Sequence, residues 1–491
     1  MHQKAIVIGC GIAGLATSIR LKTAGFDVKL FETNSYPGGK LHQIKTQGFR
    51  FDMGPSLFTM PWLIDELFQL CNKNPKDYFE YKEKEVICNY FWEDGTTFTV
   101  DSDSEVFITK AAKAFGESPE NLRKYLEVNK SKYELTKSIF LEKSLHKANS
   151  YLSSKTIKAL LKIGQMGINR TLDQWNAGFF RNTKLIQLFN RFATYNGSSP
   201  YRTPGIMSMI PHLEMGLGAY FPKGGMYQIT TSLYSLAKDI GVEFHFNSPV
   251  HKIKVTNNQA VGVMTESGLE NAAVVVSNMD VYPTHRKLLS DQKAPERVLK
   301  QERSSSALIF YWGIKKKFPE LDLHNIFFSE DYESEFEHIF EKKTLFEDPT
   351  VYINISSKEE PKDAPNNCEN WFVMINAPGN YNQDWEELKK QAKKNILNKL
   401  GRILGCDIAK LIVEEIVLEP KTIEENTSSY RGALYGASSN SKFAAFLRHP
   451  NFSGKIKGLY FCGGSVHPGG GIPLCVLSAR IVSDLVKMDE R

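Results

Sequence analysis

Short apolar runs alternate with amphipathic segments over the first 60 residues. Residues 5–8 and 28–31 form two such runs, which predict strands. Between them, residues 12–24 carry apolar side chains at the spacing of one helical face. The pattern therefore predicts a βαβ unit, in which the crossover between the two parallel strands is right-handed.

The same alternation returns in separated parts of the chain. Further strands are expected at residues 242–246, 261–264, 273–276, 307–313, 351–355, 371–375 and 459–462. One helix is expected from residue 118, where Ser118 and Pro119 supply a cap and a first-turn proline, and others at residues 384–404 and 474–486. Because strand–helix–strand pieces are interrupted by two other blocks, we expect a discontinuous two-domain protein.

Positive charge is concentrated in one part of the chain. The net charge is only +6, from 61 Lys and Arg against 55 Asp and Glu. Residues 123–191, however, hold 14 basic and four acidic side chains. A helical pattern in this region places Lys155, Lys158 and Lys162 away from its apolar face. We expect an anionic surface, and not nucleic acid, as the partner of this region, although a solvated helix face would have the same pattern.

The composition excludes several classes of protein. Mean hydropathy is −0.32, and no stretch approaches the roughly 20 apolar residues that span a bilayer. The N-terminus runs directly into the first strand without the apolar core of a signal peptide. The seven cysteines include no C-x-x-C pair, which argues against a disulfide framework or a zinc site. We therefore expect a cytoplasmic protein without a metal centre.

A glycine motif joins the first predicted strand to the first predicted helix. Gly9, Gly11 and Gly14 form G-x-G-x-x-G, which lets backbone amides at a helix N-terminus approach a pyrophosphate. Glu32 closes the second strand, where a carboxylate accepts hydrogen bonds from a ribose diol and would repel a 2′-phosphate. These features predict a dinucleotide site; a purely structural turn would require all of them to coincide by chance.

Three further runs carry a resemblance to a known family. Residues 36–40 read Y-P-G-G-K and are followed at residues 48–56 by G-F-R-F-D-M-G-P-S. Residues 463–473 read G-G-S-V-H-P-G-G-G-I-P. The first two runs resemble the FAD-binding amine-oxidase and carotenoid-desaturase superfamily. The last run, with residues 221–225 and 274–280, resembles the bacterial carotenoid desaturases of the phytoene-desaturase family.

The resemblance implies an α/β fold of the GDI-like two-domain flavoprotein type. A Rossmann-type FAD-binding domain would comprise residues 1–70, 225–300 and 450–491. An inserted mixed-sheet substrate domain would comprise residues 71–115, 195–224 and 301–449. Residues 116–194 would form the basic helical region that faces a membrane.

The resemblance also implies which residues contact FAD. Lys40 would pair with the pyrophosphate, where many relatives carry Arg, and the Val250 backbone would meet the adenine. Amides at residues 471–473 would stabilise negative charge on the reduced flavin. His467 is a weak candidate for a chemical role, because it could equally shape its turn. The implied cofactor residues are Gly9, Gly11, Ile12, Ala13, Gly14, Glu32, Gly39, Lys40, Gly54, Pro55, Ser56, Val250, Met279, Gly464, Ser465, Gly471, Ile472 and Pro473.

The residues also limit the reaction. A single dinucleotide motif gives no sign of a nicotinamide site, so a diffusible acceptor, oxygen or a quinone, is expected to reoxidise the flavin. No metal-ligand cluster, nucleophile elbow or paired acid–base motif stands out, and this absence fits desaturation of a polyene. Residues 203–221 are rich in Met and small side chains, which fits either a slot for an isoprenoid or ordinary core.

Four segments resemble the hydroxycarotenoid 3,4-desaturases within this family. They lie at residues 56–61, 88–92, 351–358 and 369–378. The resemblance implies insertion of a C3–C4 double bond into a 1-hydroxylated carotenoid, at the membrane surface from which such a substrate must be taken. Three alternatives stay open: a multi-step phytoene desaturase, an amine or protoporphyrinogen-type oxidase, and a prenyl-binding chaperone of the Rab-escort type. Intact Gly9, Gly11, Gly14 and Glu32, together with the complete C-terminal run, argue against the chaperone.

Overall fold

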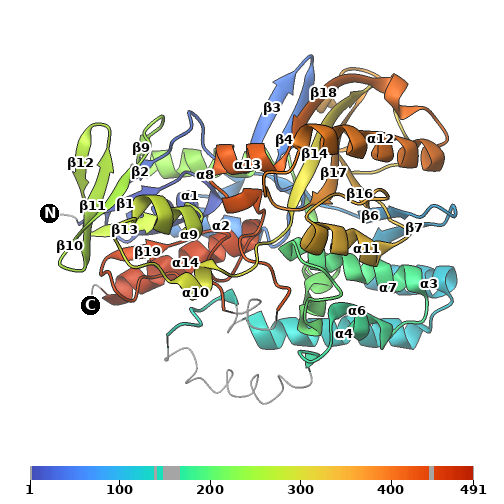
Figure 1. Cartoon of the computed structure of the whole chain (residues 1–491), viewed down its shortest axis with the longest axis horizontal. Helices are drawn as coiled ribbons and strands as arrows, with labels where there is room; N and C mark the ends of the chain where they lie inside the picture. Colours follow the sequence, from blue (N-terminus) through green and yellow to red (C-terminus); the bar gives the residue numbers. More distant parts are fainter. Residues whose placement is uncertain (1–2, 138–140, 148–165, 442–446, 490–491) are drawn as a thin grey trace.

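A parallel five-stranded sheet forms one half of the molecule (Figure 1). The computed structural model describes residues 3–137, 141–147, 166–441 and 447–489. The sheet has the order β19-β13-β1-β2-β9, and all its neighbouring pairs are parallel. Its strands are β1 (Lys4–Ile8), β2 (Asp27–Phe31), β9 (Glu243–His245), β13 (Val274–Ser277) and β19 (Leu459–Phe461). The predicted βαβ unit is confirmed, with α1 (Ile12–Thr23) between its strands.

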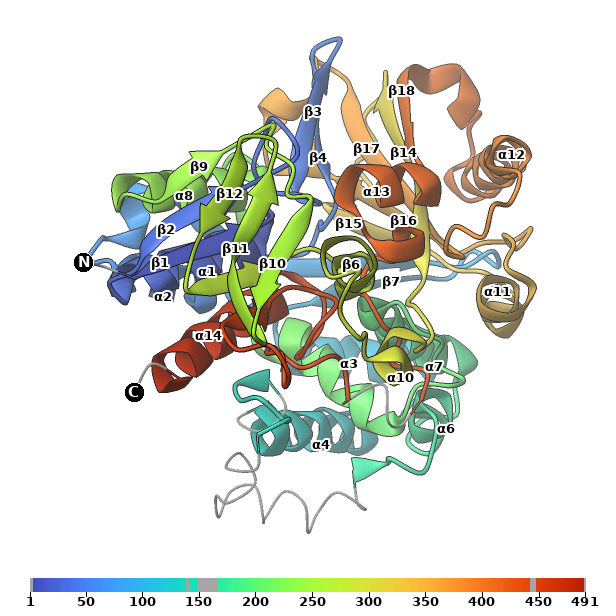
Figure 2. The same ribbon diagram turned by 60° about the vertical axis from the view of Figure 1, so that its left-hand side comes forward.

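Helices cover one face of this sheet. Helix α1 is buried from Ile12 to Leu21, because α2 (Trp62–Leu70), α8 (Tyr227–Asp239) and α14 (Ile472–Asp489) pack around it. A small antiparallel sheet lies on the other face (Figure 2). It consists of β10 (Lys252–Thr256), β11 (Gln259–Thr265) and β12 (Gly268–Asn271). The strands of the large sheet are thus buried on both sides, as expected for parallel strands.

A mixed seven-stranded sheet forms the second half. Its order is β18-β14-β17-β16-β15-β6-β7, and only the β15–β6 pair is parallel. Helix α12 (Trp385–Leu404) packs on one face through a core that includes Trp312 and Trp371. The strands are β6 (Val86–Phe91), β7 (Thr97–Asp101), β14 (Ser306–Ile314), β15 (His324–Phe327), β16 (Val351–Ile355), β17 (Glu369–Ala377) and β18 (Ile412–Leu418).

A hairpin from the N-terminal part of the chain links the two halves. It consists of β3 (His42–Thr46) and β4 (Phe49–Met53). Phe49 and Phe51 pack against Tyr311 and Phe372 of the mixed sheet. The segment after β4 therefore passes between the two sheets. A second short pair, β5 (Tyr81–Glu83) with β8 (Tyr220–Pro222), joins distant segments.

A helical layer lies below the mixed sheet in the view of Figure 1. It comprises α3 (Ser104–Phe115), α4 (Pro119–Thr136), α6 (Leu172–Ala177) and α7 (Thr183–Asn190). The expected cap of α4 is confirmed, because the Ser118 hydroxyl accepts a hydrogen bond from the Asn121 amide. Lys155, Lys158 and Lys162 lie outside the described residues. Within the described ranges, no helix has the length and apolar character needed to cross a bilayer.

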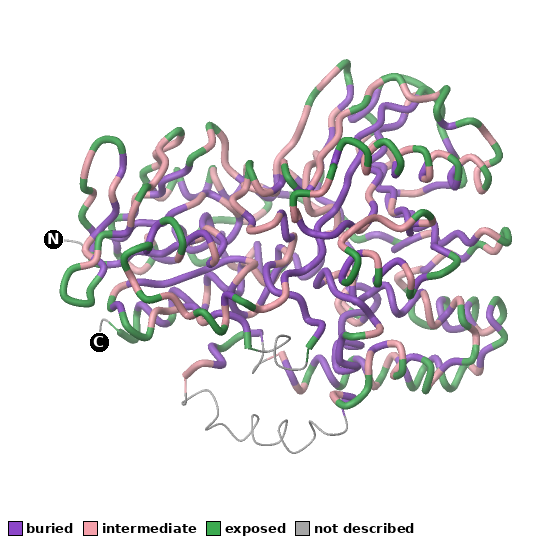
Figure 3. Tube along the Cα trace, in the orientation of Figure 1, coloured by how far each residue is buried: buried purple, intermediate pink, exposed green. Residues whose placement is uncertain are grey.

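Short elements complete the fold. They are α9 (Val281–Pro283), α10 (Glu296–Leu299), α11 (Tyr332–Glu337), α13 (Pro420–Thr427) and the helical turns Arg191–Asn196, Gly205–Met209 and His212–Gly216. Buried residues follow the strands of both large sheets, whereas the outer hairpins are exposed (Figure 3). The buried regions meet where the two halves join, and the candidate site lies there.

Candidate cofactor and substrate site

One cavity of about 630 Å³ extends between the two halves of the molecule. The turn between β1 and α1, the segment after β4, the turn before α14 and the face of the mixed sheet all contribute to its wall. Every residue that the sequence implicates in cofactor binding lines this cavity, except Gly14. The structure therefore brings the N-terminal, central and C-terminal motifs together at one site.

The first turn of α1 faces the cavity with unused backbone amides. Gly11 is the N-cap residue and makes no side-chain capping bond, so the first N–H groups of the helix are available to a ligand. Gly14 has a packing role instead: a Cβ atom there would lie 2.0 Å from the Gly9 carbonyl oxygen. Asn278, which sequence reasoning did not single out, lies over the same turn and donates to the Gly9 carbonyl at 3.3 Å. This glycine cradle fits the pyrophosphate of a dinucleotide.

Glu32 is held firmly at the cavity wall. Its Oε2 accepts a hydrogen bond from the Cys10 amide at 2.7 Å, and its Oε1 accepts one from the Asn34 amide at 2.9 Å. Both amides belong to the loops at the ends of β1 and β2, so the strand ends orient the carboxylate. Each oxygen keeps further acceptor capacity for a ribose diol. The acceptor oxygens of Glu32 thus fit the ribose in the adenosine half of a dinucleotide.

Lys40 connects the two halves across the cavity. Its Nζ donates to the Ala433 and Leu434 carbonyls at 3.1 and 3.0 Å. Burial lowers the pKa of Lys40 to about 8, and nearby Asp280 partly offsets that effect. The ammonium group is therefore held by the opposite segment, while its proposed contact with a pyrophosphate stays a prediction.

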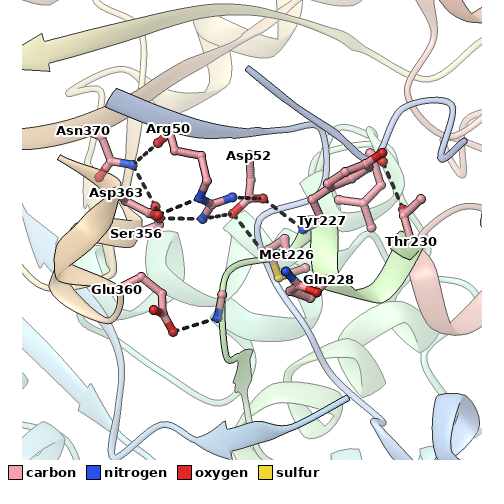
Figure 4. A network of polar contacts seen from close by, with 12 residues as sticks. Arg50, Asp52, Met226, Tyr227, Gln228, Thr230, Ser356, Glu360, Asp363 and Asn370 are labelled. Carbon is pink, nitrogen blue, oxygen red and sulfur yellow. Dashed lines mark hydrogen bonds and ion pairs between the residues drawn. The ribbon is translucent and has the colours of Figure 1, made fainter. Parts of the chain in front are cut away.

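Asp52, the acid of the run at residues 48–56, anchors the hairpin through a network of polar contacts (Figure 4). It does not line the cavity. Its carboxylate accepts hydrogen bonds from the Met226 and Tyr227 amides at 2.9 Å each, at the start of α8. Arg50 donates to Asp52 at 2.7 Å and also pairs with Asp363 of the other half. This network fixes the exit of β4 and thereby the position of Gly54, Pro55 and Ser56 at the cavity.

The C-terminal turn ends at the N-terminus of α14. Ser465 accepts a hydrogen bond from the Val281 amide at 3.1 Å, which ties the turn to α9. His467 is buried, and burial lowers its pKa to about 4, so the ring is neutral. Its Nε2 lies 2.8 Å from the Lys143 carbonyl oxygen, to which it donates. The ring therefore holds the turn against the segment that follows α4, and this geometry supports a shaping role for His467.

The rest of the cavity wall is largely apolar. Tyr352 on β16 and Phe372 and Met374 on β17 line it from the mixed sheet. Four residues line it from the helical turns between residues 205 and 216, namely Met207, Met209, Ile210 and Leu213. Other members of the Met-rich stretch, such as Met215 and Phe221, are buried without lining the cavity. Residues 203–221 thus divide between the cavity wall and ordinary core, and the slot for an isoprenoid stays a prediction.

A buried ion pair on this wall was not predicted. Arg191 Nη2 lies 2.9 Å from Glu214 Oε1, and Arg191 Nε donates to the Tyr90 hydroxyl at 2.6 Å. Burial raises the pKa of Glu214, although Arg191 opposes that rise. The two residues come from different helical turns and form no motif, so the sequence held no signal for the pair. Among the described residues, no group of three or more His, Cys, Asp or Glu is arranged to hold a metal.

Comparisons with known proteins found a matching family model and similar curated proteins. A model of the family described as flavin containing amine oxidoreductase matches residues 12–487. The chain is 63% identical over 484 residues to the 1-hydroxycarotenoid 3,4-desaturase of Flavobacterium sp. (strain P99-3), with 99% of each chain covered. It is 32% identical over 498 residues to the 4,4′-diapolycopene oxygenase of Methylomonas sp, again with 99% of each chain covered. The resemblance to carotenoid desaturases is thereby confirmed.

Solved structures show the same fold at low sequence identity. Putrescine oxidase bound to putrescine has a TM-score of 0.64 at 13% identity, with 99% of each chain covered. Cyclohexylamine oxidase from Brevibacterium oxydans IH-35A has a TM-score of 0.62 at 15% identity, with 100% of each chain covered. With the family match over nearly the whole chain and the glycine cradle in place, this chain belongs to the flavin-containing amine oxidoreductase family.

Proposed function

We propose that this chain is an FAD-dependent desaturase that introduces a C3–C4 double bond into a 1-hydroxylated carotenoid. One observation carries the proposal: the cavity is continuous from the glycine cradle to an apolar wall of Met, Leu, Ile and Phe side chains. A long isoprenoid can thus reach the cofactor without leaving apolar surroundings. The identity of 63% to a relative named for this reaction supports the same substrate class.

The chain's own residues bind, orient and exclude water. Glu32 and the first turn of α1 would hold the adenosine and pyrophosphate, and the turn before α14 would hold the flavin ring. When bound, the flavin would supply an acceptor for a hydride from one carbon of the polyene, and the neighbouring carbon would lose a proton to water or a weak base. The apolar wall excludes water from the reacting carbons and keeps the flexible chain extended. A diffusible acceptor, oxygen or a quinone, would then reoxidise the flavin.

Pigment analysis in a carotenoid-producing host tests this function. One strain would offer phytoene, and another would offer 1-hydroxylated γ-carotene or lycopene. We expect a gain of one conjugated double bond only in the hydroxylated strain. Conversion of phytoene to coloured products would instead favour the multi-step phytoene desaturase.

The cofactor assignment has its own test. Glu32→Arg removes the expected ribose acceptor and adds bulk at the same place, so the purified variant should contain almost no flavin. Visible absorbance of the protein relative to its peptide absorbance measures this directly. Normal occupancy in the variant would contradict the proposed adenosine site.

We further propose peripheral binding to a membrane through the basic region, because the substrate is insoluble in water. Reversal of Lys155, Lys158 and Lys162 to Glu should weaken binding to anionic vesicles by roughly 1 kcal/mol per charge. Reversal of Lys390 and Lys394, exposed on α12, is the matched control and should have little effect. Equal binding by all variants would leave the basic region as a solvated surface.

A further inference from the structure

A chain of polar side chains interrupts the apolar wall of the mixed sheet. The Tyr352 hydroxyl lies 2.8 Å from Ser56 Oγ and 2.7 Å from His324 Nδ1. Asn354 Nδ2 lies 3.2 Å from the same imidazole nitrogen. His324 and Asn354 are buried, whereas Ser56 and Tyr352 keep part of their surface open. Since Ser56, His324 and Tyr352 all line the cavity, the hydrogen-bonded chain ends there.

The positions of the protons in this cluster of hydrogen-bonded side chains follow from Asn354. Its amide nitrogen also lies 3.1 Å from the Leu323 carbonyl oxygen, so the nitrogen, and not the amide oxygen, faces His324. An amide nitrogen only donates, which makes Nδ1 of His324 the acceptor, shared between Asn354 at 3.2 Å and the Tyr352 hydroxyl at 2.7 Å. The ring proton is then on Nε2, a buried atom without a hydrogen-bond partner among the described residues. The Tyr352 hydroxyl therefore donates its single proton to His324, and Ser56 in turn donates to Tyr352.

The hydroxyl oxygens of Ser56 and Tyr352 line the cavity. Because their protons are already used, both can only accept a hydrogen bond from a ligand. The Tyr352 oxygen receives one hydrogen bond from Ser56 and keeps a second lone pair, and the Ser56 oxygen keeps its own. An acceptor without a partner is unfavourable in apolar surroundings. The ligand that fits such a wall is an apolar molecule with one hydroxyl group that donates.

The cluster lies where the end of a carotenoid with a hydroxyl group on C1 would have to bind. Three bonds separate the oxygen on C1 from C3, and at about 1.5 Å per bond the two atoms lie within about 4 Å of each other. A group that binds the hydroxyl must therefore lie beside the flavin. Ser56 is one of the residues expected at the flavin. The Arg191–Glu214 pair, by contrast, is already engaged with Tyr90 and Tyr195.

We propose that the Tyr352 hydroxyl, oriented by Ser56 and His324, accepts a hydrogen bond from the tertiary hydroxyl on C1 and so sets C3 and C4 against the flavin. This role rests on the proposed function and identifies the group that distinguishes a hydroxylated end from a hydrocarbon end. Tyr352 touches the substrate, whereas His324 is a positioning residue. An ether oxygen cannot donate, so a 1-methoxy end should be rejected together with the hydrocarbon end.

Three carotenoids with the same chromophore and a 1-hydroxy, 1-methoxy or hydrocarbon end test this role. Anaerobic single-turnover reduction of the flavin in the holoenzyme gives an apparent dissociation constant and a rate for each. The unmodified protein should prefer the 1-hydroxy end about 10- to 100-fold over both others. Tyr352→Phe should abolish that preference at normal flavin content. Tyr381→Phe, a change of the same kind away from the cavity, is the control and should keep it.

His324→Leu supplies a readout that a merely structural role would not change. Without the imidazole acceptor, the Tyr352 proton becomes free to donate into the cavity. The variant should then accept the 1-methoxy end nearly as well as the 1-hydroxy end, while still rejecting the hydrocarbon end. Flavin content and melting temperature verify that the variant is folded.

The outcomes separate this role from the function itself. A preference for the 1-hydroxy end that survives Tyr352→Phe would overturn the role of Tyr352 and leave the function standing. Equal turnover of 1-hydroxy and 1-methoxy ends by the unmodified protein would overturn the acceptor-only arrangement. Turnover of hydrocarbon ends alone would overturn both the proposed function and the role.

Discussion

The two ends of the cavity are built in different ways. At the cofactor end, backbone amides and glycines of short contiguous runs form the wall, as in the turn from Gly9 to Ile12. At the substrate end, isolated side chains from strands and helical turns far apart in the chain form it, such as Tyr352, Met209 and Arg191. A dinucleotide can thus be recognised by local geometry, whereas an isoprenoid is recognised by the packing of the whole fold.

Because of this difference, the two ends of the cavity tolerate different substitutions. A backbone site depends on the close approach of main-chain atoms, so a single added methyl group can destroy it. A side-chain site depends on shape and on a few polar groups, so most substitutions there change selectivity before they change folding. The buried ion pair at the substrate end, and a buried lysine in the helical layer, are exceptions that can be tested.

The largest effect is expected at the glycine cradle. Gly14→Ala places a Cβ atom 2.0 Å from the Gly9 carbonyl oxygen, so α1 must move away from the turn. Because the pyrophosphate would bind to this turn, we expect the variant to lose nearly all of its flavin. The flavin-to-protein ratio after purification measures the loss.

Gly454→Ala is the matched control for that experiment. A Cβ atom at Gly454 meets nothing within 4 Å, and its backbone does not require a positive φ. Its flavin content should equal that of the unmodified protein. Full flavin content in Gly14→Ala would mean that the β1–α1 turn is not the cofactor cradle.

The ion pair at the substrate end should matter for stability. Glu214→Gln keeps the shape of the side chain but leaves the buried Arg191 without a counter-charge. We expect the free energy of unfolding to fall by about 3–5 kcal/mol. Denaturant unfolding, followed by fluorescence, measures the change.

The double variant Arg191→Met with Glu214→Leu sharpens this result. It removes both charges and keeps apolar volume, so it should recover much of the lost stability. If the double variant is as unstable as Glu214→Gln, the hydrogen bond from Arg191 to Tyr90, and not the charge, stabilises this part of the wall.

The cofactor end could be predicted from the sequence because its signals are local. The βαβ unit, Glu32 and the C-terminal glycine run occupy fixed spacings that a single sequence reveals. Strand β16 was also predicted with the correct bounds, at residues 351–355. The linking hairpin β3–β4 was not, because its position between the sheets depends on the packing of Phe49 and Phe51.

The substrate end could not be predicted in the same detail. Strand β16 is largely buried on both faces, so its sequence lacks the polar–apolar alternation that would identify the face at the cavity. Tyr352 therefore reads as one more aromatic residue of a strand. His324 and Ser56, its partners, are 28 and 296 residues away in the chain. Only the folded sheet brings them together.

A pH-dependent effect is expected from Lys132, a buried lysine of the helical layer that has no carboxylate partner among the described residues. Lys132 on α4 is buried, its Nζ donates to the Gly205 carbonyl and the Ser208 hydroxyl at 3.0 and 2.8 Å, and it lies over the Trp175 ring. Burial lowers the pKa of Lys132 to about 6, from 10.5 for a free side chain. Between these two values the unfolded chain binds a proton that the folded protein does not.

The stability of the unmodified protein should therefore rise with pH from about 6 to about 10.5, by at most about 1.4 kcal/mol per pH unit from this residue. Lys132→Met removes the titrating group and should be the more stable protein at pH 6, with the difference fading as the pH approaches 10.5. Urea unfolding of both proteins across this range measures the difference. A difference that does not change with pH would mean that the folded protein keeps Lys132 charged, held by its hydrogen bonds and the Trp175 ring. In that case the helical layer would tolerate a charge without a counter-ion through local contacts with the backbone and the Trp175 ring.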